Sequence, residues 1–258
     1  MRSLTEIAPG VFVATSSYAL TTTTLVAGSP GSGGCLLIDP AVTVAELAAL
    51  AVSLRALGLR PAAAWSTHPH WDHVLWSAEF GEAPRYASPA AVTAAETGRD
   101  AILAGVQADA PGHDLSLVGR LRPLDAAALG WDGPQARLIV HDGHAPGHGA
   151  VFLPGTGVLA AGDMCSDVEI PLLDMLAADP LGGYRTGLDR LAAVPGVRQV
   201  IPGHGHVGDA AEFRRRLALD SAYLDAIAGG NPSRDPRLED CPDWLRATHE
   251  EQVRYFRR

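Results

Sequence analysis

The stretch Thr67-His68-Pro69-His70-Trp71-Asp72-His73 decides how the rest of the chain is interpreted. It places three histidines and one aspartate within six residues, directly after an apolar run. This context is typical of a buried strand that ends in a loop and then a helix start. Period-two spacing puts His68 and His70 on one side of an extended chain, whereas Asp72 and His73 come from the turn. The spacing therefore favours two adjacent metal ions over one.

A solvated surface loop is the competing interpretation of this stretch. Short motifs of this kind also arise by chance, so the rest of the chain has to support a metal site. Burying four unpaired imidazole or carboxylate groups would cost several kcal/mol. Metal binding therefore explains the cluster better than chance, provided that further ligands occur elsewhere.

Composition limits the classes of function. The 258 residues are 47% hydrophobic and 19% charged, and the net charge of −9 disfavours a nucleic-acid partner. The chain has no lysine, which excludes Schiff-base chemistry, and its three cysteines are too widely spaced for a disulfide framework. No signal peptide or membrane-spanning run is visible. We therefore expect a cytoplasmic protein that acts on a small molecule without a membrane partner, and a homo-oligomer stays open.

Apolar periodicity predicts an alternation of strands and helices. The expected strands are 11–16, 21–27, 35–38, 62–67, 86–88, 138–141, 150–153, 158–161 and 199–201. The expected helices are 43–59, 89–103, 183–194, 210–227 and 242–257. A strand–turn–helix pattern thus occurs twice, at about 1–105 and 135–230. We interpret residues 106–134 as a variable insertion over the site, and 165–180 as an apolar loop after a strand end.

Four separate strand ends carry residues that bind metals. They are the opening stretch, His148, Asp163 and His204, and each follows a short apolar run or adjoins one. Strand ends are where α/β folds place their sites. Together these positions offer five imidazoles and two carboxylates, a donor set that suits zinc, with iron or manganese as alternatives.

The order T-H-x-H-x-D-H, then G-H, G-D and G-H, resembles the metallo-β-lactamase-fold hydrolase superfamily from Val11 to about Ile227. The resemblance implies an α/β fold (α+β), a four-layer αββα sandwich with the site at the edge of its two sheets. It also implies a single domain over 1–258, with C-terminal helices at about 209–257 packed on it.

The same resemblance implies a dinuclear site. It assigns His68, His70 and His148 to the first metal, Asp72, His73 and His204 to the second, and Asp163 to a bridging position. Two divalent ions, zinc above all, would hold a bridging hydroxide that attacks an ester-like substrate: a lactone, a thioester or a phosphoester. Asp72 would also pass a proton to the leaving group. A non-heme iron redox enzyme, a β-lactamase-like amide hydrolase and a non-catalytic binding module stay as alternatives.

Further residues are candidates for supporting roles. Asp39 matches the family's acidic residue at the end of an early strand, where it would orient a ligand from behind. His144 and His206 are expected at the rim of the site or behind its ligands. For the remaining three, a pocket position competes with ordinary packing in the core: Trp71, Cys165 and Tyr184.

The ligand set also narrows the choice within the superfamily. Glyoxalase II-like thioesterases and acyl-homoserine-lactonase-like enzymes share the full set, whereas persulfide dioxygenases use a reduced one. Nuclease members need a basic channel, which is not visible here. The apolar stretch 170–178 favours a partly hydrophobic substrate.

Overall fold

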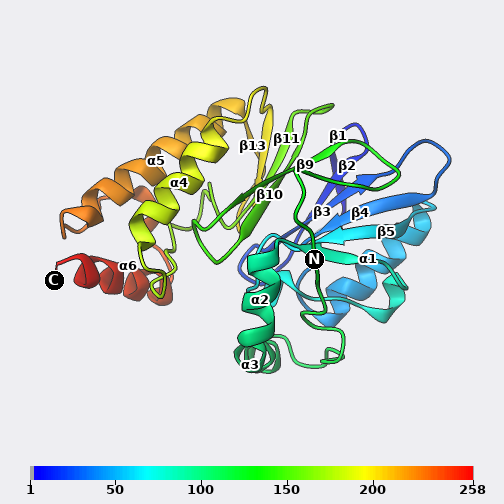
Figure 1. Ribbon diagram of the computed structural model, residues 1–258, viewed down its shortest axis with the longest axis horizontal. Helices are drawn as coiled ribbons and strands as arrows, with labels where there is room; N and C mark the ends of the chain where they lie inside the picture. The colour runs from blue at the N-terminus through cyan, green and yellow to red at the C-terminus, as the bar shows by residue number, and fades with distance from the viewer. Residues whose placement is uncertain (1–2, 258) are drawn as a thin grey trace.

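Two β-sheets face each other in the computed structural model, which describes residues 3–257 (Figure 1). The first sheet has seven strands in the order β1-β2-β3-β4-β5-β6-β7. The pairs β1–β2, β2–β3 and β3–β4 are antiparallel, whereas the pairs β4–β5, β5–β6 and β6–β7 are parallel. The strands of this sheet are β1 (Thr5–Ala8), β2 (Val11–Thr15), β3 (Thr22–Ala27), β4 (Gly34–Ile38), β5 (Arg60–Trp65), β6 (Arg85–Ala87) and β7 (Arg122–Pro123).

The second sheet has six strands in the order β13-β12-β11-β10-β9-β8. Only β11 and β12 are parallel within it. Its strands are β8 (Ala128–Leu129), β9 (Ala136–His141), β10 (His148–Leu153), β11 (Val158–Gly162), β12 (Gln199–Pro202) and β13 (Gly208–Asp209).

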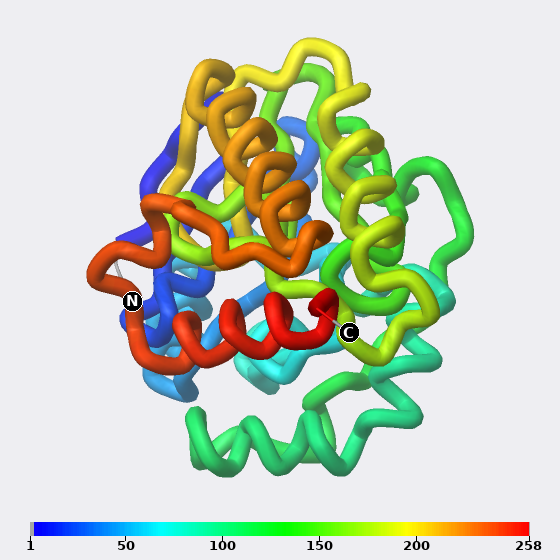
Figure 2. The backbone as a smooth tube through the Cα atoms, turned by 90° about the vertical axis from the view of Figure 1, so that its left-hand side faces the viewer, coloured from blue at the N-terminus to red at the C-terminus, as the bar shows by residue number. Residues whose placement is uncertain are grey.

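Helices cover the outer face of each sheet, which gives the four layers that were predicted. Helices α1, α2 and α3 lie on the side of the first sheet, and α4, α5 and α6 on the side of the second (Figure 1). The last helix, α6, lies across one end of α4 and α5 (Figure 2). The helices are α1 (Val44–Ala56), α2 (Pro89–Thr97), α3 (Arg99–Asp109), α4 (Pro180–Ala192), α5 (Ala210–Ala228) and α6 (Asp243–Phe256), with 3-10 turns η1 (Trp71–His73), η2 (Ala78–Phe80) and η3 (Pro236–Leu238).

Alternation of side chains along the strands creates the layers. In β4, Leu36 and Ile38 pack in the cluster between the two sheets, whereas Leu37 packs against the α1 side. In β10, Val151 points between the sheets and Phe152 points toward α4 and α5. Both β4 and β10 are therefore apolar on both faces, as the continuous apolar runs in the sequence require.

The expected strands are confirmed, with ends within two residues of those predicted. The expected helix 89–103 is two helices, because Gly98 ends α2 and begins α3. The helix start expected after the opening stretch is only the single turn η1. Within residues 3–257, no helix is both long and apolar enough to cross a membrane.

Residues 106–134 do not form an insertion over the site. Val106, Ala110 and Val118 are buried in the apolar cluster that also contains residues of the first sheet and α1, and β7 and β8 each extend an edge of a sheet. None of the residues in this segment lines the cavity described below. Their apolar side chains draw the segment into the core instead of leaving it across the pocket.

Candidate metal centre

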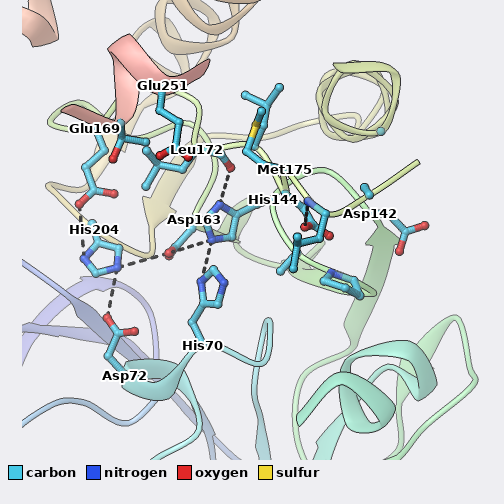
Figure 3. A pocket seen from close by; sticks show the side chains of 18 of the residues that line it. His70, Asp72, Asp142, His144, Asp163, Glu169, Leu172, Met175, His204 and Glu251 are labelled. Atoms are coloured by element: carbon cyan, nitrogen blue, oxygen red, sulfur yellow. Dashed lines mark hydrogen bonds and ion pairs between the residues drawn. The ribbon is translucent and has the colours of Figure 1, made fainter. Parts of the chain in front are cut away.

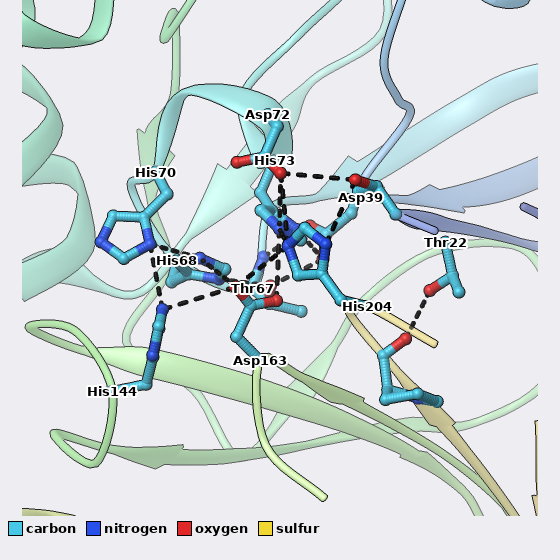
Figure 4. A network of polar contacts seen from close by, with 12 residues as sticks. Thr22, Asp39, Thr67, His68, His70, Asp72, His73, His144, Asp163 and His204 are labelled. Carbon is cyan, nitrogen blue, oxygen red and sulfur yellow. Dashed lines mark hydrogen bonds and ion pairs between the residues drawn. The ribbon is translucent and has the colours of Figure 1, made fainter. Parts of the chain in front are cut away.

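Strand ends from both sheets meet at one edge of the sandwich (Figure 4). His68 follows β5, and the rest of the opening stretch continues into η1. Asp163 directly follows β11, and His204 lies shortly after β12. His144 lies in the turn between β9 and β10. The fold thus brings segments that are far apart in sequence to one polar site.

The first group of potential metal ligands contains His68, His70, His144 and Asp163, whose donor atoms lie within 4.8 Å of one another. His70 Nδ1 is 3.0 Å from both His68 Nε2 and His144 Nε2. Asp163 Oδ2 is 3.4 Å from each of the same two Nε2 atoms. Three imidazoles and a carboxylate therefore point at one small volume.

The second group contains Asp72, His73 and His204. His73 Nε2 is 3.3 Å from His204 Nε2, and Asp72 Oδ2 is 3.3 Å from His204 Nε2. Asp163 reaches this group as well, with Oδ1 3.2 Å from His73 Nε2 and Oδ2 3.3 Å from His204 Nε2. Asp163 thus lies between the two groups, as a bridging ligand would.

In His68 and His144, the ring nitrogen that points away from the site has a hydrogen-bond partner, and partners of this kind set the tautomer of a ligand histidine. His144 Nδ1 lies 2.8 Å from the Leu172 carbonyl oxygen, which can only accept. His68 Nδ1 lies 3.0 Å from Thr67 Oγ1, whose hydrogen is donated to Asp39. The Nε2 atoms of His68 and His144 therefore carry lone pairs, and His70 Nδ1 can donate to only one of them. A cation among these atoms resolves the mismatch.

The electrostatics of the second group also favour a bound cation. Burial opposes protonation of His73, but Asp163, Asp72 and Asp39 raise its pKa to about 9. Burial also opposes ionisation of Asp72, yet His73 and His204 lower its pKa to about 2. In the first group, by contrast, burial lowers the pKa of His144 to about 3. The surroundings thus favour neutral imidazoles in one group and positive charge in the other, which suits metal cations.

Asp39 supports this arrangement through contacts with Thr67 and His73. Its Oδ1 accepts from the Thr67 backbone N–H at 2.8 Å, and its Oδ2 accepts from Thr67 Oγ1 at 2.6 Å. Oδ2 also lies 3.1 Å from His73 Nδ1. Asp39 adopts a left-handed φ of 49°, which Asp and Asn tolerate better than most residues. The carboxylate therefore connects the start of the opening stretch to its last histidine.

His148 lies outside both groups, contrary to the sequence-based assignment, and His144 stands in the place predicted for it. His148 begins β10, so strand alternation directs it with Ala150 and Phe152 toward the α4 side. Its Nε2 accepts from the Asp163 backbone N–H at 3.2 Å, and its ring stacks on His141 at 4.6 Å. His148 thus supports the Asp163 backbone from inside the fold.

The other candidate residues lie in the pocket, in the core or on the surface. Trp71 lines the cavity and also packs edge-on against Tyr18, with ring centroids 5.3 Å apart. Cys165 and Tyr184 are buried in the core between the second sheet and its helices, away from the cavity, and burial raises the pKa of both. His206 is exposed and pairs with Asp167 at 2.8 Å, outside the cavity.

A cavity of about 1650 Å³ opens over the two groups (Figure 3). Its floor includes His70, Asp72, His144, Asp163 and His204. Its walls come from the 165–180 loop, from the start of α4 and from α6. The site is therefore accessible to a small molecule from one side.

Several residues of this cavity were not identified from the sequence. Tyr18 precedes β3, Glu169 lies in the 165–180 loop, and Glu251 comes from α6. Glu169 is 9% exposed, and its Oε1 is 3.9 Å from His204 Nδ1. Burial raises its pKa to about 7. An acidic residue six positions after Asp163 was the available signal for Glu169, whereas no local pattern marks the other two.

Comparison with known proteins agrees with this geometry. The sequence model of the "Metallo-beta-lactamase superfamily" matches residues 19–224. A curated protein named hydroxyacylglutathione hydrolase, from Rhodobacter capsulatus, is 34% identical over 155 residues. That match covers 60% of this chain and 51% of the relative, so the chain spans about half the length of that protein.

Solved structures show the same fold. A metallo-beta-lactamase family protein from Thermus thermophilus is 24% identical, with a TM-score of 0.66 over 87% of this chain and 83% of that one. Another protein, solved in a di-iron-bound form, is 27% identical, with a TM-score of 0.61 over 80% of this chain and 98% of that one.

Proposed function

Because the chain belongs to the metallo-β-lactamase superfamily, we propose that it is a metal-dependent hydrolase that cleaves a thioester or a closely related carboxylic ester. The observation that carries this proposal is the convergence of imidazole and carboxylate donors from separate strand ends, directly beneath an open cavity. The name of the Rhodobacter capsulatus relative supports the choice of a thioester. Lactones and phosphoesters are the next substrates to compare.

We assign the ligands from the observed distances. His68, His70 and His144 would hold one divalent ion, and Asp72, His73 and His204 would hold the other, with Asp163 between them. Zinc suits this donor set, and iron suits it too, as the di-iron form of the structural relative illustrates. When bound, two such ions supply Lewis acidity, which activates water and polarises the carbonyl of the substrate.

The chain's own residues bind, orient and shield the reacting groups. Asp72 lies at the cavity floor and is 6% exposed, so it would contact both a metal and the incoming substrate. In thioester hydrolysis the oxygen of water bonds to the acyl carbon, the carbon–sulfur bond breaks, and the thiol leaves with a proton. We assign the transfer of that proton to Asp72.

An activity screen tests the proposal. The purified protein is stripped of metal and reloaded with zinc, iron or manganese, and each form is assayed on a neutral thioester, a lactone and a phosphodiester. We expect thioester hydrolysis that requires metal and is lost when Asp72 is replaced by Ala. Equal turnover with and without metal would refute the assignment. Iron-dependent consumption of oxygen without hydrolysis would favour the redox alternative instead.

A further inference from the structure

The outer part of the cavity is apolar and aromatic. The 165–180 loop contributes Leu172 and Met175 (Figure 3). It also contributes Leu173 and Leu176, and α6 contributes Trp244. Leu176 is 98% exposed and Trp244 is 47% exposed, and apolar surface that gathers beside a groove is typical of a ligand-binding site. The part of a substrate that lies above the metal groups would therefore meet hydrocarbon and aromatic surface.

The charges around this surface all have one sign. Outside the two metal groups, the cavity is lined by the carboxylates of Asp142, Asp174, Asp179 and Glu251. Among residues 3–257, no arginine lines it, and the chain contains no lysine. A wall lined by charges of one sign attracts ligand groups of the opposite sign and repels those of the same sign. No cationic side chain of the described walls would pair with an anionic group of the substrate.

We propose that the enzyme takes thioesters or esters whose leaving group is apolar and carries no net negative charge, and that it discriminates against glutathione thioesters. This inference rests on the proposed hydrolase function and specifies its substrate class. The glutathione part of such a thioester carries two carboxylates and one ammonium group, so its net charge is negative. It would bring negative charge to a wall that already holds several carboxylates and no cation.

A pair of substrates with the same acyl group tests the charge rule. The lactoyl thioester of glutathione carries a negative leaving group, and the lactoyl thioester of N-acetylcysteamine carries a neutral one. We expect kcat/KM of the metal-loaded enzyme to be at least about tenfold higher for the neutral thioester, since charge-lined clefts change encounter rates by factors of about 10 to 1,000. Added salt should reduce this ratio by screening the carboxylates.

Two variants on α6 identify the source of the discrimination. Glu251→Arg reverses one charge at the cavity wall, so it should raise kcat/KM for the glutathione thioester and narrow the ratio. Glu250→Arg makes the same charge change on the neighbouring residue, which lines a different pocket, and should leave the ratio unchanged. The neutral substrate reports whether either variant still folds and turns over.

The outcomes separate this inference from the function on which it rests. Faster hydrolysis of the glutathione thioester would overturn the charge rule while leaving the hydrolase proposal intact. Equal effects of Glu251→Arg and Glu250→Arg on the ratio of the two kcat/KM values would also overturn the charge rule. The cavity wall would then not be the source of the discrimination between the two thioesters. Failure of the metal-loaded enzyme on both thioesters would refute the thioesterase function and this inference with it.

Discussion

At the scale of the residue, His144 and His148 show what a sequence pattern leaves undecided. Each histidine follows a glycine, and both lie close to the start of the same strand, so a G-H motif fits either one. The choice depends on where β10 begins. Because His148 is already part of the strand, its side chain follows the strand's alternation into the core, while His144 in the turn reaches the site.

We expect His144→Ala and His148→Ala to fail in different ways. His144→Ala should remove a metal ligand, so the protein should bind about one equivalent less metal and lose at least about a hundredfold in activity. His148→Ala should leave the metal content intact but reduce the free energy of unfolding by about 1–3 kcal/mol, because the Asp163 N–H loses its buried acceptor. Metal analysis and urea unfolding of both variants measure the difference. Loss of metal in His148→Ala alone would restore the original assignment.

Asp39 offers a second test at this scale. Asn fits the same left-handed backbone, so Asp39→Asn removes the charge behind His73 while the main chain stays in place. We expect metal affinity to fall about 10- to 100-fold, as is usual when the partner of a ligand histidine is weakened. Competition with a chromophoric chelator measures the affinity. An unchanged affinity would mean that Thr67, and not His73, is the important partner of Asp39.

At the scale of the element, α6 shows how the C-terminal part of the chain supports the site. Gln252 is 1% exposed and bonds to both sides of Leu172: its Oε1 accepts from the Leu173 N–H at 2.9 Å, and its Nε2 donates to the Pro171 carbonyl at 3.0 Å. The Leu172 carbonyl in turn lies 2.8 Å from His144 Nδ1. One glutamine on the last helix therefore fixes the peptide that orients a proposed metal ligand.

Replacement of Gln252 should therefore act at a distance. Gln252→Leu keeps the side chain's bulk but leaves the Leu173 N–H and the Pro171 carbonyl without partners, so we expect weaker metal binding at the His144 group. The loss of stability should be about 1–3 kcal/mol. Gln252→Glu keeps only the acceptor and should be intermediate. Cobalt substitution followed by absorption spectroscopy reports the geometry of the site, and a spectrum identical to the wild type in Gln252→Leu would contradict the linkage.

The elements differ in how well the sequence predicts them. Strands such as β4 and β10 are continuous apolar runs, and the N-terminus of α1 carries a capping box between Thr43 and Glu46, so local patterns identify them. The break at Gly98 and the single turn η1 were missed, because a glycine within a helical pattern and a short turn give weak local signals. The contact between α6 and the 165–180 loop is long-range and has no local signature.

At the scale of the whole molecule, the fold was predictable because its layers follow from side-chain alternation, whereas the walls of the pocket were not. Pocket residues such as Tyr18, Glu169 and Glu251 come from three segments that meet only after the sheets and helices pack. The sequence predicted that the opening stretch, Asp163 and His204 converge, since each adjoins a strand end. It did not predict that part of 106–134 would join the core on the α1 side of the first sheet.

Both halves of the sandwich contribute proposed metal ligands, so we expect bound metal to hold the halves together. His68 and His73 follow the first sheet, and Asp163 and His204 follow the second. A ligand that binds only the folded state stabilises it by about 4 kcal/mol at roughly a thousand times its Kd. We therefore expect chelation to lower the thermal midpoint by several degrees but not to unfold the protein, because three large apolar clusters are independent of the site. Differential scanning calorimetry with and without chelator measures the shift. His73→Ala should show a smaller shift, since its second group is incomplete, and an equal shift in His73→Ala and wild type would place the stabilising ion elsewhere.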